Sequence, residues 1–378
     1  MTPKVPPELE RVVHRALEKR PESRYSSAEA MLEDLKKSRD ALRSAETRPF
    51  LFNSLSQAPA MDRSPKNGFR CALYPSPEKI PEKAFQVEGI PEDEFPDLYK
   101  QRPVADSVFQ AYREQFSYDK TDLQARVEWR KENSEGWIQE KITFDAAYGG
   151  ERVIAYLFLP RNTSPPYQTV IFFPGAAATS RRSSQDLETQ YSGDLSFIIK
   201  NGRAVLYPVY KGTFERGNDS LAALADEWGE SHQSAELMIQ QIKDFRRCVD
   251  YLETRQDIDG KKFAFYGISW GGRFGAIIPA VEPRLKASVL MGASMFLTLH
   301  PEVSPINYVT RVKIPTLMLN GKFDIRRPEK TIQPMYDLLG TPAPDKQLKL
   351  YETDHTPPRN ELIKETLAWL DRYLGPVQ

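Results

Sequence analysis

The segment that most constrains the fold of this chain is FYGISWGG, residues 265–272. The apolar and aromatic residues that lead into it are typical of a buried strand, and the residues that follow are typical of a helix. A serine with glycines two positions before and after it marks a sharp turn between such elements and exposes the serine hydroxyl. Both glycines are needed because a larger side chain would collide with the neighbouring strand or helix. Ser269 is therefore a candidate nucleophile, with an ordinary strand-to-helix turn as the alternative.

The order of polar residues after this turn suggests partners for Ser269. In a strand–turn–helix site of this kind, the acid and then the base follow the nucleophile along the chain. His355, one of four histidines, stands on the loop after the last predicted strand. Asp324 occupies the matching loop after the preceding strand, and Glu352 is the weaker alternative. We predict that Ser269 attacks, His355 accepts its proton, and Asp324 orients His355.

Two backbone N–H groups are candidates for stabilising an oxyanion beside the nucleophile. The turn aims the N–H of Trp270 at the place where negative charge would form. The second donor is expected on the loop after the buried run TVIFF, where the small residues PGAAA let the backbone approach a substrate. We predict the N–H of Ala176 as this donor, within one residue either way.

Other loops at the carboxyl ends of strands are candidates for substrate contact, because such loops line the sites of open α/β sheets. Tyr210 and Arg216 follow the buried run AVLY, and we expect them to reach the pocket; a solvated loop is the alternative. Arg326 and Arg327 come just after Asp324. They would favour an anionic substrate if they face the pocket, although a solvated basic turn explains them more simply.

These motifs resemble those of the α/β-hydrolase family, and within it the dienelactone-hydrolase and acetyl-xylan-esterase type of domain. The resemblance covers roughly residues 100–376 and rests on FFPGAAA, YGISWGG, NGKFD and DHTPPRNEL. It implies an α/β fold with a mostly parallel, doubly wound sheet, and hydrolysis of a small-molecule ester such as an acetylated sugar. Dienelactone hydrolases proper carry a cysteine where this chain has Ser269, and Asp354 stands where glycine often precedes the histidine.

Composition excludes several other functions. Lysine plus arginine and aspartate plus glutamate each total 52, so no net charge favours binding to nucleic acid or to an anionic membrane. Cys71 and Cys248 are too few and too far apart for a disulfide framework or a zinc site. No apolar run is long enough to cross a bilayer, and no signal peptide is evident. We expect a cytoplasmic protein without metal or cofactor, and its oligomeric state stays open.

The start of the chain resembles a different family. The segment VPPELERVVHRALEKRPESRYSSAEAMLEDL is similar to the last helices of the C-lobe of bacterial serine/threonine protein kinases. This implies a short N-terminal helical extension, which we assign to residues 1–45. The sequence has no glycine-rich nucleotide loop, strand lysine, catalytic-loop aspartate or metal-binding Asp-Phe-Gly. We therefore predict no kinase activity.

Two further segments precede the hydrolase-like part. Residues 46–76 resemble the C-terminal end of formylglycine-generating (sulfatase-modifying-factor-like) domains, including their Gly-Phe-Arg strand. Residues 77–102 are rich in proline and acidic residues, and we interpret them as a linker. The hydrolase-like domain then spans residues 103–378. Because neither N-terminal fragment can bury a core alone, we predict that residues 46–100 are proteolytically labile.

Hydrophobic periodicity predicts the main elements of this last domain. Residues 147–150 should form a hairpin turn between two of its strands. The expected helices span 103–116, 183–201, 228–252 and 359–374, and the expected strands span 138–146, 152–160, 169–173, 204–207, 262–266, 287–291, 316–319 and 348–351.

The combined prediction is a serine hydrolase that cleaves a small-molecule carboxylic ester through an acyl-enzyme intermediate. Two alternatives stay open. One is a catalytically silent binding or regulatory remnant of a kinase–hydrolase fusion, which the intact order of Ser269, Asp324 and His355 disfavours. The other is a serine peptidase of the prolyl-oligopeptidase kind, which the lack of a propeller-length N-terminal domain disfavours.

Overall fold

The structure divides into two units, residues 1–87 and 88–378, which are described separately. It is a computed structural model that describes residues 12, 15, 16, 25, 27, 30–35, 97–132, 136–185, 187–296, 298, 300–324 and 327–377. The predicted formylglycine-type remnant at 46–76 lies outside the described residues. So does the predicted linker before residue 97.

The described part of the first unit contains a short helix at residues 30–35. The Tyr25 hydroxyl donates a hydrogen bond to the Asp34 carboxylate at 3.1 Å. The Arg15 guanidinium lies 4.4 Å from the centre of the Tyr25 ring. The helix agrees with the helical character expected there, and the kinase resemblance of residues 1–45 stays a prediction.

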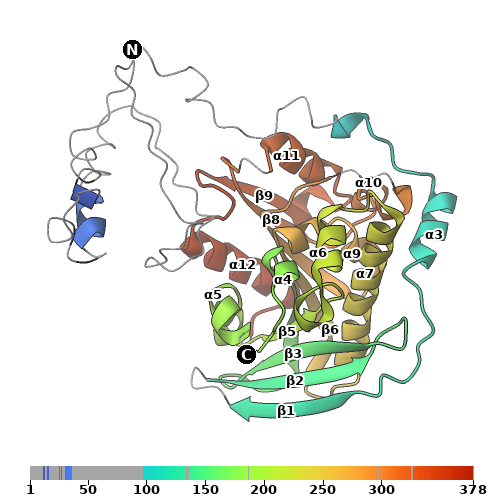
Figure 1. Cartoon of the computed structure of the whole chain (residues 1–378), viewed down its shortest axis with the longest axis horizontal. Helices are drawn as coiled ribbons and strands as arrows, with labels where there is room; N and C mark the ends of the chain where they lie inside the picture. The colour runs from blue at the N-terminus through green and yellow to red at the C-terminus, as the bar shows by residue number, and fades with distance from the viewer. Residues whose placement is uncertain are drawn as a thin grey trace. The chain divides into compact units, whose positions relative to one another are not determined.

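The second unit is built on a nine-stranded sheet whose strands lie in the order β1-β2-β3-β5-β4-β6-β7-β8-β9 (Figure 1). The strands are β1 (Arg126–Glu132), β2 (Trp137–Asp145), β3 (Arg152–Pro160), β4 (Tyr167–Phe173), β5 (Ala204–Val209), β6 (Ile258–Ile268), β7 (Leu285–Met291), β8 (Thr316–Gly321) and β9 (Lys346–Tyr351).

The sheet is antiparallel at one side and parallel over the rest. Strands β1, β2, β3 and β5 pair antiparallel, and every pairing from β5 across to β9 is parallel. This confirms the mostly parallel α/β sheet and the hairpin of β2 and β3. The prediction missed β1, because its exposed and charged residues lack the apolar signal of a core strand.

Helices cover both faces of the sheet, as Figure 1 shows. They are α3 (Asp106–Glu114), α4 (Ala177–Ser180), α5 (Leu187–Lys200), α6 (Asp219–Asp226), α7 (His232–Glu253), α8 (Trp270–Phe274), α9 (Ile278–Val281), α10 (Ile306–Val309), α11 (Glu329–Leu338) and α12 (Arg359–Leu374), with 3-10 turns η5 (Leu98–Lys100), η6 (Phe214–Arg216), η7 (Pro301–Val303) and η8 (Ala343–Asp345).

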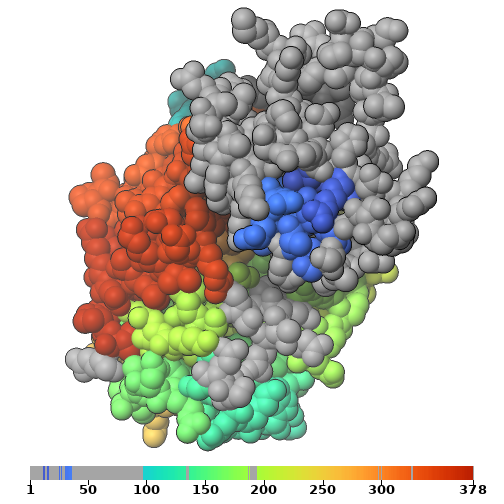
Figure 2. All heavy atoms as spheres, turned by 90° about the vertical axis from the view of Figure 1, so that its left-hand side faces the viewer, coloured from blue at the N-terminus to red at the C-terminus, as the bar shows by residue number. Residues whose placement is uncertain are grey.

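Two apolar clusters fill the space between the sheet and its helices. Side chains of α5 and α12 pack into one cluster, and those of α3, α7, α8, α10 and α11 pack into the other. Figure 2 shows the surface on the α5 and α12 side, where the red C-terminal segment lies beside the green segment that includes α5. The strands between the two clusters are buried on both faces, which explains why their sequences are continuous apolar runs.

Three predicted helices, α3, α5 and α7, begin later than expected, and for α5 and α7 the structure shows a local reason. Helix α7 starts after Trp228, whose φ of 55° is incompatible with the helix, and Ser231 caps it by accepting the Ser234 N–H at 3.1 Å. Helix α5 starts after Ser184, whose hydroxyl and N–H both donate to the Glu215 carboxylate. The hydrophobic periodicity of the sequence continues across the starts of α5 and α7, so it could not locate the first residue of either helix.

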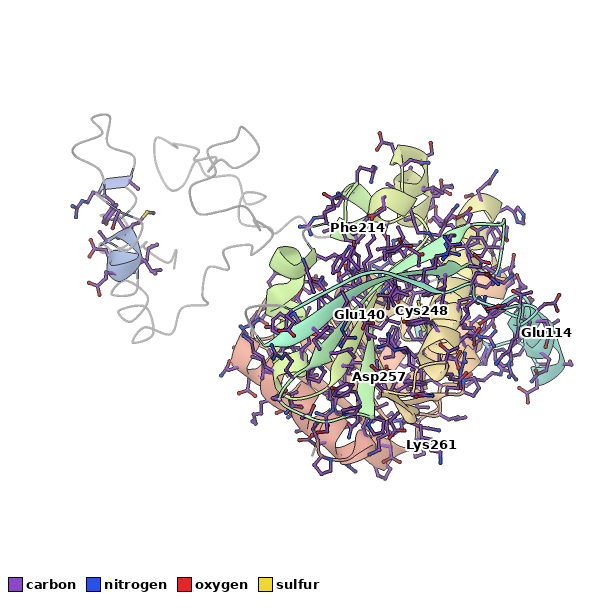
Figure 3. All side chains as sticks on the ribbon, turned by 90° about the horizontal axis from the view of Figure 1, so that it is seen from below. Glu114, Glu140, Phe214, Cys248, Asp257 and Lys261 are labelled. Atoms are coloured by element: carbon purple, nitrogen blue, oxygen red, sulfur yellow. The ribbon has the colours of Figure 1, made fainter. Side chains whose placement is uncertain are left out.

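One arginine, Arg255, pairs with two carboxylates and so links the antiparallel part of the sheet to the parallel part. Figure 3 labels Glu140 on β2 and Asp257 just before β6. The Arg255 guanidinium forms ion pairs with both carboxylates, at 2.5 Å from Glu140 and 2.7 Å from Asp257.

Within the part of the chain that the structure describes, no helix combines the length and apolar character that crossing a membrane needs. The carboxyl ends of β4 and β6–β9 meet at one edge of the sheet, where the predicted site residues follow them.

Candidate active site

The turn at Ser269 has the backbone geometry of a nucleophile held at the tip of a sharp turn, and the residue is partly exposed. Ser269 has φ 55° and ψ −104°, between the end of β6 and the start of α8. A non-glycine residue with positive φ is uncommon and costs about 1–3 kcal/mol, so the surrounding structure must hold it. The Ser269 N–H donates to the Met291 carbonyl at 2.7 Å, and this bond fixes the turn against the end of β7.

The two glycines of the motif are needed for close backbone approach. A Cβ atom on Gly267 would lie 2.6 Å from the Gly271 carbonyl oxygen. One on Gly271 would lie 2.2 Å from the Phe173 carbonyl oxygen at the end of β4. Any side chain at either position would push α8 away from the sheet and move Ser269 with it.

Asp324 and His355 meet across the ends of β8 and β9. His355 Nδ1 lies 2.5 Å from Asp324 Oδ2. The Asp324 side chain is 1% exposed and that of His355 is 19% exposed, so the carboxylate is buried while the imidazole reaches solvent. A buried carboxylate on Nδ1 fixes the orientation of the ring and leaves Nε2 to face a substrate.

The His355 ring lies against Gly292, which follows β7. A Cβ atom on Gly292 would be 2.7 Å from His355 Cε1 and 3.1 Å from Nε2. The neighbouring Met291 carbonyl accepts the N–H of Ser269. The end of β7 therefore brings the serine and the histidine to the same place, as the chain order of the predicted triad requires.

The Ser269 hydroxyl accepts a hydrogen bond from an arginine in this structure. Arg327 Nη2 donates to Ser269 Oγ at 3.2 Å. Arg327 stays close to the acid as well, since its N–H donates to Asp324 Oδ1 at 3.2 Å. Within the described residues the hydroxyl has this partner rather than His355, and a nucleophile-to-base bond often tightens only when substrate binds.

The predicted oxyanion donors lie on adjoining segments. Trp270 is the first residue of α8, so its N–H has no acceptor within the helix. Ala176 caps α4 and is exposed. A Cβ atom on Gly175 would lie 3.7 Å from that of Ser269, and the Gly271 N–H donates to the Pro174 carbonyl at 2.9 Å. These contacts hold the loop after β4 beside the nucleophile.

Two residues predicted to line the substrate site belong to the protein interior instead. Tyr210 is fully buried, its hydroxyl donates to the Phe172 carbonyl at 2.9 Å, and its ring stacks on Phe173 at 3.9 Å. Arg216 is 7% exposed and pairs with Asp244 at 2.5 Å. The loop does follow the carboxyl end of β5, as expected, but these two side chains point into the protein interior. Arg326, the third predicted lining residue, lies outside the described residues.

Sequence reasoning missed the arginine that follows the turn of the nucleophile. Arg273 is four residues after Ser269, and its N–H donates to the Ser269 carbonyl at 3.2 Å. Its guanidinium lies 4.1 Å from the Trp228 ring and 5.4 Å from the Phe296 ring. No sequence pattern marks this stack, because its members come from three separate segments.

The described residues offer no other site of this chemistry. No three histidine, cysteine, aspartate or glutamate side chains among them are grouped so as to hold a metal ion. Cys248 is buried, and burial raises the pKa of its thiol well above the ordinary value, so it is not an alternative nucleophile. Cys71 lies outside the described residues.

Comparison with known proteins places the chain among hydrolases. The dienelactone hydrolase family model matches residues 154–359, which is more than half of the chain and includes Ser269, Asp324 and His355. Over 216 residues the chain is 26% identical to acylamino-acid-releasing enzyme of Rattus norvegicus. The match takes in 48% of this chain but only 28% of that enzyme's length.

Two solved structures share the fold. The acetyl xylan esterase from Paenibacillus sp. R4 has a TM-score of 0.55 at 17% sequence identity, and the match covers 75% of this chain and 100% of that one. Acetyl xylan esterase 1 from Thermoanaerobacterium sp. JW/SL YS485 has a TM-score of 0.56 at 16% identity, covering 75% of this chain and 99% of that one.

Proposed function

Because the chain belongs to the dienelactone hydrolase family, we propose that it is a serine hydrolase that cleaves carboxylic esters of small molecules. The observation that carries this proposal is the 2.5 Å contact between His355 and the buried Asp324, next to a serine held at positive φ. A buried acid, a partly exposed base and a partly exposed nucleophile are the parts that acyl transfer needs.

In the proposed reaction His355 removes the Ser269 proton as Oγ attacks the ester carbonyl carbon. Asp324 stabilises the imidazolium that forms, and the N–H groups of Trp270 and Ala176 stabilise the oxyanion. His355 then protonates the departing alcohol, which leaves an acyl group on Ser269. Water activated by His355 hydrolyses this acyl-enzyme and restores the serine.

The test is hydrolysis of 4-nitrophenyl acetate by the full chain and by Ser269→Ala, with a fluorophosphonate probe applied to both. We expect turnover and labelling of the parent alone. Folding of both proteins is checked by circular dichroism and thermal melting. If Ser269→Ala turns over as fast as the parent, the serine mechanism is wrong.

Two rival functions give different outcomes in the same assay. A catalytically silent remnant would be folded yet neither label nor turn over. A peptidase is suggested by the match to acylamino-acid-releasing enzyme, of which the chain covers 28%. An N-acetylated amino-acid 4-nitroanilide tests it: hydrolysis of this amide by the parent that is lost in Ser269→Ala would favour the peptidase, and no Ser269-dependent hydrolysis of the amide would leave the esterase proposal standing.

The N-terminal segments stand apart from this activity. We propose that residues 1–45 and 46–76 are remnants of kinase and formylglycine-generating domains, on the sequence resemblance alone. Radioactive phosphate transfer from ATP to a general protein substrate tests the first of these. We expect none, because the sequence lacks the residues that bind nucleotide and metal in kinases.

A further inference from the structure

We propose that Asn320, near the end of β8, is a positioning residue that keeps the nucleophile and the base of this site aligned with each other. This inference rests on the proposed esterase function and adds a residue to the same site. Asn320 would act through the turn at the end of β7, residues 291–293, against which Ser269 and His355 both lie.

This turn supports both reacting side chains. The carbonyl of Met291 accepts the Ser269 N–H at 2.7 Å. The next residue, Gly292, leaves the space that the His355 ring occupies, because a Cβ atom there would lie 2.7 Å from the ring. A displacement of the turn would therefore move the serine and the histidine relative to each other.

Backbone hydrogen bonds join the loop that carries His355 to the loop after β8. The N–H of Lys322 donates to the Tyr351 carbonyl at 2.7 Å. The N–H of Phe323 donates to the Thr353 carbonyl at 3.0 Å. The base therefore moves with the end of β8, whereas the nucleophile is bonded to the end of β7.

Asn320 extends the bonding between these two strand ends. The backbone provides one bond there, because the Gly292 N–H donates to the Leu319 carbonyl at 2.9 Å. One residue further along each strand, the side-chain amide of Asn320 donates to the Ala293 carbonyl at 2.7 Å. The amide nitrogen must face this carbonyl, because a carbonyl oxygen can only accept. The side chain thus ties the turn to β8 where the ladder of the sheet ends.

The burial of Asn320 is unfavourable apart from this bond. The residue is 0% exposed, and its Oδ1 atom makes no hydrogen bond within the described part of the chain. A buried polar atom without a partner costs free energy, and an apolar side chain would avoid that cost. The bond to Ala293 is a contribution that an apolar side chain could not make, and it acts directly beside the site.

The experiment removes the donor and follows the chemical step. Asn320→Leu keeps the branched shape of the side chain but cannot donate to Ala293. We expect kcat/KM on 4-nitrophenyl acetate and the rate of fluorophosphonate labelling to fall about hundredfold, the effect of a shift of about 1 Å in a reacting group. Inhibition by 4-nitroacetanilide, the amide analogue of this ester, should stay within about threefold of the parent, because the substrate contacts are unchanged.

A matched control separates positioning from stability. Gln241 is also a buried amide, 1% exposed, and donates to the Lys211 carbonyl at 2.9 Å in the loop after β5. Gln241→Met and Asn320→Leu should both lower the melting temperature by about 2–4 °C. Only Asn320→Leu should lose activity, and Gln241→Met should keep kcat/KM within about twofold of the parent. Equal losses of activity in the two variants would overturn the inference.

The outcomes also separate this inference from the proposed function. Parent-like rates in a folded Asn320→Leu overturn the inference, while Ser269-dependent turnover keeps the esterase. A hundredfold loss that is matched by an equal loss of 4-nitroacetanilide inhibition overturns it as well, because Asn320 would then affect substrate binding. A parent without Ser269-dependent turnover overturns both. If Asn320→Leu does not fold, Asn320→Ala with Gln241→Ala as its control decides by the same criteria.

Discussion

Individual close contacts between atoms fix the positions of the reacting side chains in this site. Gly292 is the clearest case: it has φ 60°, and the His355 ring occupies the space that a Cβ atom would need. Sequence reasoning did not single it out, because one glycine after a strand carries no motif. Its role follows only from the position of the imidazole.

Gly292→Ala should displace the His355 ring and lower kcat/KM on 4-nitrophenyl acetate by about hundredfold, since a shift of about 1 Å in a reacting group has this effect. The matched control is Gly260→Ala, because no atom lies within 4 Å of a Cβ at Gly260. Steady-state kinetics on both variants provides the measurement. Equal activities would show that the ring moves aside without cost.

Asp324→Asn should lower kcat by about a thousandfold or more, because an amide cannot hold the imidazole in its tautomer or stabilise its charged form. Asp354→Asn is the control: this carboxyl neighbours His355 in sequence, and we expect activity near that of the parent. A large loss in Asp354→Asn with little loss in Asp324→Asn would reverse the assignment of the acid.

At the level of elements, a buried polar network holds the loop after β5 against α7. Arg216 on this loop pairs with Asp244 of α7 at 2.5 Å and also donates to the Tyr148 hydroxyl at 2.9 Å. The N–H of Lys211 donates to Asp244 at 2.8 Å. Each polar group in this network therefore has a partner in the interior, which gives the loop a structural role.

Asp244→Asn should destabilise the protein by about 3–5 kcal/mol, because the buried charge of Arg216 then keeps only the partly exposed Glu151 carboxylate, 3.5 Å away, as an ionic partner among the described residues. Tyr148→Phe removes two hydrogen bonds, the one that its hydroxyl donates to Asp244 and the one that it accepts from Arg216, and should cost about 1–2 kcal/mol. Denaturant unfolding measures both. Equal stability losses in the two variants would mean that water reaches Arg216 and compensates its charge.

The elements themselves could largely be predicted from the sequence. The helix–strand alternation and the β2–β3 hairpin are confirmed, because a strand buried on both faces must be apolar throughout and a helix must bury one stripe. Strand β1 and the starts of α5 and α7 were missed. Those features depend on an exposed edge and on side-chain bonds to distant residues such as Glu215.

At the scale of the whole molecule, all described site residues fall within one unit. The nucleophile, the acid, the base, the predicted oxyanion donors and Arg327 lie between residues 174 and 355, inside the unit that spans 88–378.

A fragment of residues 88–378 should therefore fold and keep the kcat/KM of the full chain within about twofold. The prediction that residues 46–100 are labile adds that limited proteolysis should release a fragment of this kind. Mass spectrometry of the digest and ester kinetics on the fragment provide the measurements. A folded but inactive fragment would show that the first unit completes the site.

The sequence by itself determined the family, the sheet and the candidates Ser269, Asp324 and His355, because turns and strand ends are local features with their own residue signals. Only the tertiary structure decided which side chains face the site. It placed Tyr210 and Arg216 in the interior, stacked Arg273 on Trp228 and Phe296, and brought Arg327 to the Ser269 hydroxyl. The physical reason is that strand ends locate a loop, whereas the direction of each side chain depends on packing against segments far away in the chain.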